Sequence, residues 1–238
     1  MKTYLNLLKT TTALIGLAGV LLLSSCLKDH TPPYNPPIAL VSFFQAAPNV
    51  PPVDLYFDSN RVNWNPINYG TGVDYLRVYA DAKRNVNLDM PTRMDKVFSD
   101  TLKFKHNTTY SLFLADNGSK NEYVLLTDTV DKPASGKTSI RFVDLSPDAP
   151  AVDFAVKDSA AFITNKTYKG YSSFLPLNGN QTYTFNVLQH GTSNVLATLS
   201  NVSLGSGYVY TVVFTGLASG TTAANKLNAY LVTNAYFY

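Results

Sequence analysis

The chain has 238 residues and is close to neutral, with 19 basic and 16 acidic side chains and one cysteine. This charge balance argues against nucleic-acid binding, because nucleic-acid-binding proteins concentrate basic residues on one face. The length allows one large domain or two small ones.

Residues 1–25 are predicted to be a signal peptide. Lys2 and Lys9 give a positive start, and an apolar run of eleven residues follows at 13–23. That run is too short to span a membrane, which takes about 20 residues, and it fits the apolar region of a signal peptide. The segment ends in LSSC, which resembles the bacterial lipobox and implies cleavage before Cys26 and lipidation of its sulfur. The alternative is an ordinary secretory signal with a chance cysteine.

Residues 26–37 are predicted to be a lipidated cysteine followed by a proline-rich tether. Four of the eleven residues after Cys26 are proline, which favours extended polyproline II over helix. Several acyl chains together anchor a protein stably to a bilayer. We therefore expect the membrane to be a partner of this chain through the lipid on Cys26.

The remainder of the chain contains two related halves. APNVPPVDLYF (residues 47–57) aligns with SPDAPAVDFAV (residues 146–156) at an offset of 99, and the same offset holds further along. A unit of about 95 residues is too long for a solenoid repeat and long enough to bury its own core. We therefore predict two domains, residues 38–130 and residues 131–238.

Each half has the residue pattern of a β protein. Val152, Phe154 and Val156 alternate with Asp153 and Ala155, and TYTFNVL and YVYTVVF are rich in β-branched and aromatic residues, which strands favour. Turn-forming residues recur every eight to twelve positions, and no window has the pattern of an amphipathic helix. The predicted fold class is all-β, with two tandem Ig-like β-sandwich domains of about seven strands each.

The order SPDAPAVDFAV, YKGYSSFLPL, YTFNVL and GYVYTVVFTG resembles the domain of unknown function DUF4397. By this comparison the second half matches well and the first half is a more divergent copy. The resemblance implies an Ig-like sandwich in a secreted or anchored bacterial protein, with no catalytic residues to carry over. The lipobox and the richness in Tyr and Asn are similar to outer-membrane lipoproteins of Bacteroidetes, and both the periplasmic and the surface-facing side stay open.

The sequence contains no pattern typical of an enzyme. No G-x-S-x-G motif occurs, and His30, His106 and His190 are scattered. A Ser-His-Asp triad is defined by geometry, so a hydrolase is kept as an alternative. Zinc sites need clustered Cys and His. We therefore expect no catalytic residues, no metal and no cofactor.

Asp54 and Asp153 are the paired carboxylates of the repeat. Each could be a calcium ligand or a hydrogen-bond acceptor for a glycan. Calcium takes six to eight oxygen ligands, and no D-x-D-x-D loop surrounds either residue. We therefore favour a structural corner, in which the aspartate accepts backbone N–H bonds where a proline-rich turn enters a strand.

Trp64, Asn63, Asn65 and Tyr69 are the candidate ligand-binding residues. An exposed Trp beside amides is one way to stack and hydrogen-bond a sugar ring. Aromatic residues also make up β-sandwich cores, so packing in the core or between the domains is the favoured interpretation of Trp64.

Three sites match the O-glycosylation motif of Bacteroidetes, in which an apolar residue follows Asp-Ser or Asp-Thr. The acceptors would be Thr101, Thr129 and Ser159. Three matches in a Thr-rich chain also arise by chance, so this stays a hypothesis.

The expected function is that of a non-enzymatic interaction module at the cell envelope, binding a glycan or a protein partner. The alternative is a structural spacer without a ligand. A cleft lined by Tyr or Trp between the domains would favour the binding module.

Overall fold

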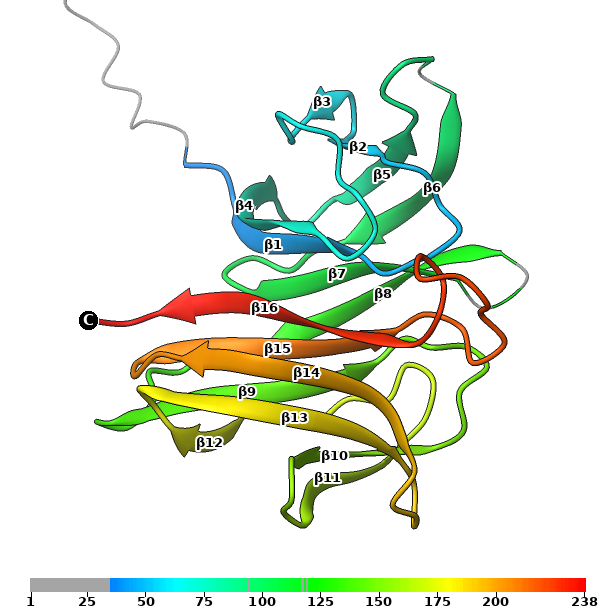
Figure 1. Cartoon of the computed structure of the whole chain (residues 1–238). Helices are drawn as coiled ribbons and strands as arrows, with labels where there is room; N and C mark the ends of the chain where they lie inside the picture. Colours follow the sequence, from blue (N-terminus) through cyan, green and yellow to red (C-terminus); the bar gives the residue numbers. More distant parts are fainter. Residues whose placement is uncertain (1–34, 94, 117, 119) are drawn as a thin grey trace, which may run out of the picture. The chain divides into compact units, whose positions relative to one another are not determined.

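The computed structural model describes residues 35–93, 95–116, 118 and 120–238 (Figure 1). The predicted signal peptide, the predicted lipidation site Cys26 and the tether up to residue 34 lie outside the described residues. Pro37–Tyr238 forms one compact unit.

The first half of this unit contains eight strands in two sheets. The strands are β1 (Ile38–Gln45), β2 (Asp54–Phe57), β3 (Asn60–Arg61), β4 (Gly72–Tyr79), β5 (Lys83–Asp89), β6 (Lys96–Lys103), β7 (Thr109–Asp116) and β8 (Asn121–Asp128). One sheet has the order β4-β1-β7-β8, and the other has the order β3-β2-β5-β6. Neighbouring strands are antiparallel except for β1 and β7, which are parallel.

The second half has the same arrangement. Its strands are β9 (Lys137–Asp144), β10 (Val152–Val156), β11 (Ala161–Lys166), β12 (Leu175–Asn178), β13 (Gln181–Gln189), β14 (Val195–Leu204), β15 (Tyr208–Thr215) and β16 (Asn228–Tyr236). Its sheets have the orders β12-β9-β15-β16 and β11-β10-β13-β14, and β9 and β15 are parallel. The two halves therefore share one strand order.

The all-β prediction is confirmed. Sixteen strands form four four-stranded sheets, and no helix occurs in the part of the chain that the structure describes. Each half has eight strands, one more than the expected number, and its two sheets form a sandwich-like unit.

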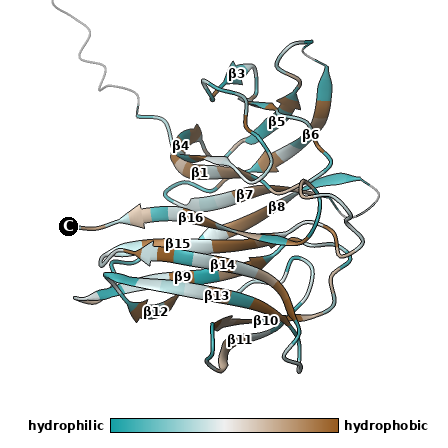
Figure 2. Ribbon diagram, viewed as in Figure 1, coloured by the Kyte–Doolittle hydropathy of each residue, from teal (hydrophilic) through white to brown (hydrophobic). Residues whose placement is uncertain are grey.

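Each half buries an apolar core between its two sheets. In the first half, Leu112 of β7 lies in one cluster with Leu55 of β2. In the second half, the Phe154 ring stacks on Phe142 and on Phe185, with ring centroids 5.0 Å apart in both pairs. Figure 2 shows hydrophobic stretches along the strands of both halves.

A third apolar cluster joins the two halves. Phe44 of β1 and Phe113 of β7 lie in it with Val143 of β9 and Val213 of β15. On β7, Leu112 therefore points into the core of the first half, whereas Phe113 points toward the second half. The sheets β4-β1-β7-β8 and β12-β9-β15-β16 face each other, so their central strands are buried on both faces, as continuous apolar runs require.

Candidate functional site

A polar cluster lies at the contact between the two halves. Arg141 of β9 is buried, and its Nη1 lies 2.7 Å from Oδ1 of Asp128 on β8. Its remaining donors reach the hydroxyl of Thr211 at 3.0 and 3.2 Å and that of Ser111 at 3.0 Å. The Tyr75 hydroxyl donates to Asp128 Oδ2 at 2.5 Å. Burial and the charge of Asp128 raise the pKa of Tyr75 above its usual range, so Tyr75 stays a donor.

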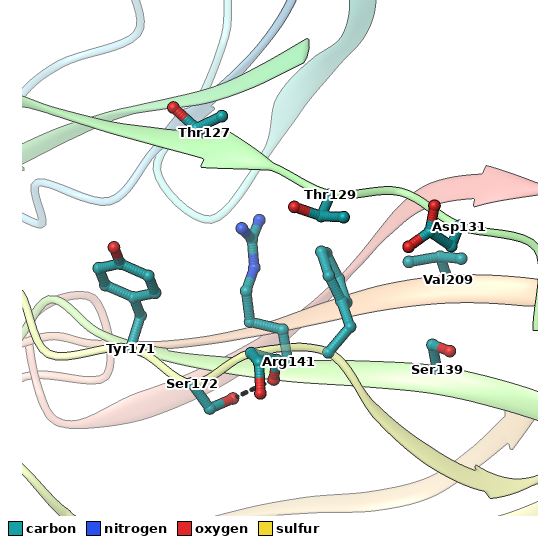
Figure 3. A pocket seen from close by; sticks show the side chains of 10 residues that line it. Thr127, Thr129, Asp131, Ser139, Arg141, Tyr171, Ser172 and Val209 are labelled. Atoms are coloured by element: carbon teal, nitrogen blue, oxygen red, sulfur yellow. Dashed lines mark hydrogen bonds between the residues drawn. The ribbon is translucent and has the colours of Figure 1, made fainter. Parts of the chain in front are cut away.

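A cavity of about 480 Å³ opens beside this cluster (Figure 3). It is lined by Thr127, Thr129, Asp131, Ser139, Arg141, Tyr171, Ser172, Ser173, Phe174 and Val209. Thr127 belongs to β8 of the first half, whereas Ser139 and Arg141 belong to β9 of the second. In Figure 3, Tyr171 lies on one side of Arg141, and Thr129 and Asp131 lie on the other. The cavity is therefore built by both halves and by the connection between them.

Most polar groups that line the cavity have no protein partner. Within the described residues, no hydrogen bond or ion pair engages the side chains of Thr127, Thr129, Asp131, Ser139, Tyr171 and Ser173. Tyr171 is 51% exposed, whereas the Arg141 guanidinium lies 4.5 Å from the Phe174 ring centroid. A cavity with free hydroxyls and an exposed aromatic ring suits a ligand that carries many hydroxyls and an apolar face.

On the other side of the contact between the two halves, the residue of the first half that is equivalent to Tyr171 is a glycine. The offset of 99 places Gly72 there, and a Cβ on Gly72 would clash with the carbonyl oxygen of Phe43. A smaller cavity of about 280 Å³ lies on this flank, lined by residues 70–74 and 231–233 among others. The two aromatic residues that line the smaller cavity, Phe43 and Phe44, are buried, whereas Tyr171 presents an exposed ring to the cavity beside Arg141.

Trp64 does not pack in the core or between the halves, and the favoured interpretation of this residue was wrong. Its side chain is 97% exposed. It lies in the loop between β3 and β4, where its carbonyl oxygen accepts a hydrogen bond from Arg61 Nη2 at 3.2 Å. Local composition does not distinguish an exposed Trp from a buried one, because that depends on where the loop lies in the fold.

Replacing Trp64 with alanine is expected to change the free energy of unfolding by less than about 0.5 kcal/mol, because the side chain buries almost nothing. Urea unfolding monitored by circular dichroism measures this change. A loss of more than about 1.5 kcal/mol would mean that Trp64 packs in the folded protein.

Two of the other three candidate residues, Asn63 and Tyr69, do not form an exposed surface with Trp64. Asn63 is buried; its Oδ1 accepts the Leu55 N–H at 2.7 Å, and its Nδ2 donates to the Asn65 carbonyl oxygen at 2.8 Å. Asn65 is exposed. Tyr69 packs edge-to-face on Tyr230 of the second half, with ring centroids 5.7 Å apart, and burial raises its pKa above the usual range. Asn63 and Tyr69 therefore hold the loop in place.

Asp54 binds the loop that follows its own strand. Its Oδ1 accepts a hydrogen bond from Asn63 Nδ2 at 2.9 Å and lies 2.8 Å from Arg61 Nη2. Asp54 is 4% exposed. Both contacts come from side chains, so Asp54 does not accept the backbone N–H bonds that we expected of a structural corner.

Asp153, the equivalent residue of the second half, binds two loops. It accepts the N–H of Asn165 at 2.8 Å and that of Gly191 at 3.2 Å, and it lies 2.8 Å from His190 Nδ1. Burial alone would raise the pKa of Asp153. The hydrogen bonds have the larger combined effect, so the pKa lies below its usual value. The donors come from later loops rather than from the proline-rich turn itself.

The three motif residues for O-glycosylation all have exposed side chains. Thr101 Oγ1 donates to Asn85 Oδ1 at 3.0 Å, and Ser159 lies in the turn after β10. Thr129 lines the cavity. Asp128, which precedes Thr129 in its motif, is buried in the ion pair with Arg141, so the folded protein does not present that aspartate.

Neither a metal-binding cluster nor a membrane-spanning helix occurs among the residues that the structure describes. No group of three or more His, Cys, Asp or Glu side chains is placed there to hold a metal ion. The same residues contain no helix with the length and apolar character needed to cross a membrane.

Sequence reasoning missed Arg141, Asp131 and Tyr171. Arg141 carried a signal, because it is a charge between the apolar residues Ile140 and Phe142 in a predicted strand. Tyr171 lies in the quoted segment YKGYSSFLPL, but its place on a cavity wall depends on the contact between the two halves.

Comparisons with solved structures give two distant similarities. The first is to CBMbc (family CBM26) from Eubacterium rectale Amy13K in complex with maltoheptaose, with 10% identity, TM-score 0.28, and coverage of 83% of this chain and 97% of that chain. The second is to a structure titled alpha-glucan binding by a streptococcal virulence factor, with 12% identity, TM-score 0.23, and coverage of 75% and 92%. Both TM-scores are below the level of a shared fold, so the function of this chain has to be inferred from its own residues.

No curated protein matches the chain. The family model described as Domain of unknown function (DUF4397) matches residues 39–155. This range covers the first half except Ile38, together with β9 and most of β10, although we expected the first half to be the more divergent one. Two copies of the family in tandem stay a prediction. A DUF4397 domain is therefore found at residues 39–155 of this chain.

Proposed function

We propose that this chain is a non-enzymatic binding protein that takes a neutral glycan into the cavity beside Arg141. The observation that carries the proposal is the lining: hydroxyls and a carboxylate without protein partners surround an exposed tyrosine ring. A sugar offers hydroxyls to such groups and an apolar C–H face to an aromatic ring. A cavity of about 480 Å³ lies in the usual range for small-molecule sites.

The charges around the cavity favour an uncharged ligand. The guanidinium of Arg141 is neutralised inside the protein by Asp128. Asp131 lines the cavity and has no cationic partner among the described residues. Its carboxylate would repel sulfated or uronic sugars, while it can accept hydrogen bonds from neutral ones.

The lining also supports binding rather than hydrolysis. Most glycosidases need two carboxyl groups, about 5 to 10 Å apart, on either side of the scissile bond. Asp131 is the single carboxylate among the residues that line this cavity, and no histidine lines it.

The location of the protein is a separate part of the proposal. The LSSC sequence supports lipidation of Cys26 and an outer-membrane anchor, with the two sandwich-like units carried on the tether. The competing function is a structural spacer, which would bind no glycan.

Replacing Tyr171 with alanine is expected to weaken glycan binding about 10- to 30-fold. The variant loses the aromatic wall of the cavity, and truncating a central aromatic contact costs about 1.4 to 2 kcal/mol. Glycan-array screening of the whole chain, followed by calorimetry with the best-bound neutral oligosaccharide, measures the change.

Two variants serve as controls for this experiment. Tyr79→Ala removes a tyrosine of similar exposure, 56%, that lies outside the cavity, and it is expected to bind like the wild type. Trp64→Ala tests the loop favoured by sequence composition. If Trp64→Ala abolishes binding and Tyr171→Ala does not, the site is the loop and not the cavity. If the wild-type chain binds no glycan, the spacer function is supported.

A further inference from the structure

Three polar side chains form a row along one wall of the cavity beside Arg141. Thr127, Thr129 and Asp131 all line it, and all three are exposed, whereas Asp128 is buried and Val130 is half-buried. This alternation is typical of an extended chain, in which alternate side chains point to the same side about 6.6 Å apart. The row therefore presents two hydroxyls and then a carboxylate to a molecule that enters the cavity.

The segment that carries this row is held on both sides of Asp131. Asp128 Oδ1 accepts a hydrogen bond from Arg141 Nη1 at 2.7 Å. Lys132 Nζ donates to the carbonyl oxygen of Tyr238 at 2.6 Å. Groups that are already held in place lose little conformational freedom when a ligand binds. The carboxylate of Asp131 is therefore placed at the cavity before a ligand arrives.

Asp131 is a free hydrogen-bond acceptor. An ionised carboxylate accepts hydrogen bonds through two oxygens and donates none, and Asp131 has no hydrogen-bond or ion-pair partner among the residues that the structure describes. The single cation in the cavity lining, Arg141, is paired with Asp128. A ligand must therefore bring its own donors to this carboxylate.

Two adjacent hydroxyls of one sugar unit suit these two oxygens, because each hydroxyl donates to one of them. An ammonium group on the ligand is the competing donor. The exposed ring that would strengthen the binding of a cation is Tyr171, and it lies on the other side of Arg141 from Asp131 (Figure 3). The ring and the carboxylate therefore do not enclose one positive charge.

We infer that Asp131 is the specificity-determining residue of the cavity, and that it accepts hydrogen bonds from two adjacent free hydroxyls of one sugar unit. The inference rests on the proposed function and names the part of the sugar that is recognised. A sugar with these hydroxyls methylated lacks the donors, and a sugar with a carboxylate meets a like charge. Tyr171 contributes affinity for the face of a ring, whereas Asp131 decides which ring is accepted.

The first test is calorimetry of the whole chain with trisaccharides of glucose, mannose and galactose, each as the neutral sugar and as the corresponding uronic acid. The wild type is expected to prefer the neutral member of the bound pair at least about 5-fold at low salt, which corresponds to about 1 kcal/mol of like-charge repulsion. Asp131→Asn keeps the shape of the side chain and removes its charge, so the ratio is expected to approach one. Asp74→Asn is the matched control, because Asp74 is exposed and lies outside this cavity, and it is expected to keep the wild-type ratio.

The second test measures the contribution of the two hydroxyls. The wild type is expected to bind a neutral trisaccharide methylated on adjacent hydroxyls, at O2 and O3 or at O3 and O4, about 10-fold more weakly than the unmethylated sugar, because hydrogen bonds to a charged acceptor are lost. Asp131→Ala is expected to weaken binding of the unmethylated sugar by a similar factor and to bind both forms with similar affinity.

The outcomes separate this inference from the proposed function. If Tyr171→Ala weakens binding while Asp131→Asn keeps the wild-type ratio of neutral to uronic sugar, the inference is wrong and the cavity stands. If the Asp131 variants weaken the binding of neutral, uronic and methylated sugars by one common factor, Asp131 only maintains the shape of the cavity, which also overturns the inference. Tighter binding of a glucosamine trisaccharide than of its neutral counterpart, lost in Asp131→Asn, would show that the residue binds a cation instead. If the wild-type chain binds no trisaccharide, the proposed function and the inference fail together.

Discussion

Replacing Asp128 with alanine is expected to lower the free energy of unfolding by about 3 to 5 kcal/mol, because it leaves a buried guanidinium without its counter-charge. The side chains of Arg141 and Asp128 are 2% and 0% exposed. Ser111 and Thr211 would still accept hydrogen bonds from Arg141, but neutral hydroxyls do not offset a buried positive charge. The substitution is expected to weaken the contact between the two halves, because both residues lie there.

Urea unfolding of the variant and the wild type measures this loss, and Lys169→Ala is the matched control. Lys169 Nζ lies 2.7 Å from Glu122 Oε2, the same separation as in the buried pair, but the two side chains are 45% and 23% exposed. Removing Lys169 is expected to cost less than about 1 kcal/mol. A variant with Asp128→Leu and Arg141→Met is expected to recover most of the stability, because apolar side chains replace the buried pair together. Equal losses for Asp128→Ala and Lys169→Ala would contradict the argument.

The strands and the duplication could be predicted because their signals are local. In VDFAV, Val152 and Phe154 alternate with Asp153, and the same pattern recurs 99 residues earlier. Alternation fixes which side chains of an ordinary strand share a face. Both cores within the halves result from this pattern and from the turn residues between the strands.

The contact between the halves could not be predicted from such signals. Strands β7 and β15 are buried on both faces, and a continuous apolar run does not say what covers its second face. Phe113 and Val213 meet across this contact only because two sheets from different halves are stacked. The cavity depends on the same stacking, since Thr127 and Tyr171 line it from different halves.

Local composition did not show which of the candidate residues have free side chains. Residues 63–69 suggested a sugar platform as the alternative to packing in the core, because they place amides beside an aromatic residue. In the fold, the Asn63 amide oxygen accepts a hydrogen bond from the backbone of Leu55, and Tyr69 packs on Tyr230 of the second half. Hydrogen-bond partners of side chains are set by tertiary contacts, so residue type and spacing alone do not predict which polar groups stay free.

Asp144 of β9 predicts an unusual dependence of stability on pH. Its carboxylate is fully buried; Oδ1 accepts the Ser146 N–H at 2.9 Å, and Oδ2 has no hydrogen-bond partner. Burial raises the pKa of Asp144 from 3.8 to about 7, against the opposing effect of the Ser146 N–H. Gln45 occupies the equivalent corner of the first half, where its Oε1 accepts the Ala47 N–H at 2.6 Å and its Nε2 donates to the Val50 carbonyl oxygen at 3.3 Å.

The raised pKa of Asp144 makes the folded state less stable as the pH rises. Between pH 4 and pH 7 the folded chain keeps a proton on Asp144 that the unfolded chain has released. Stability from this group therefore falls through that window, and the full penalty is present above pH 7. The penalty is at most about 4 kcal/mol, at about 1.4 kcal/mol for each unit of pKa.

Asp144→Asn removes the ionisation, and an amide is compatible with this corner because Gln45 provides one in the first half. The variant is expected to gain stability relative to the wild type from pH 4 to pH 8, with most of the gain complete by pH 7. Urea unfolding of both proteins at pH 4, 6 and 8 measures the difference. Asp153→Asn is the control of opposite sign, because the pKa of Asp153 is lowered by its hydrogen bonds, so that variant should lose stability at neutral pH. A difference between Asp144→Asn and the wild type that stays constant from pH 4 to pH 8 would mean that Asp144 does not hold its proton in the folded state.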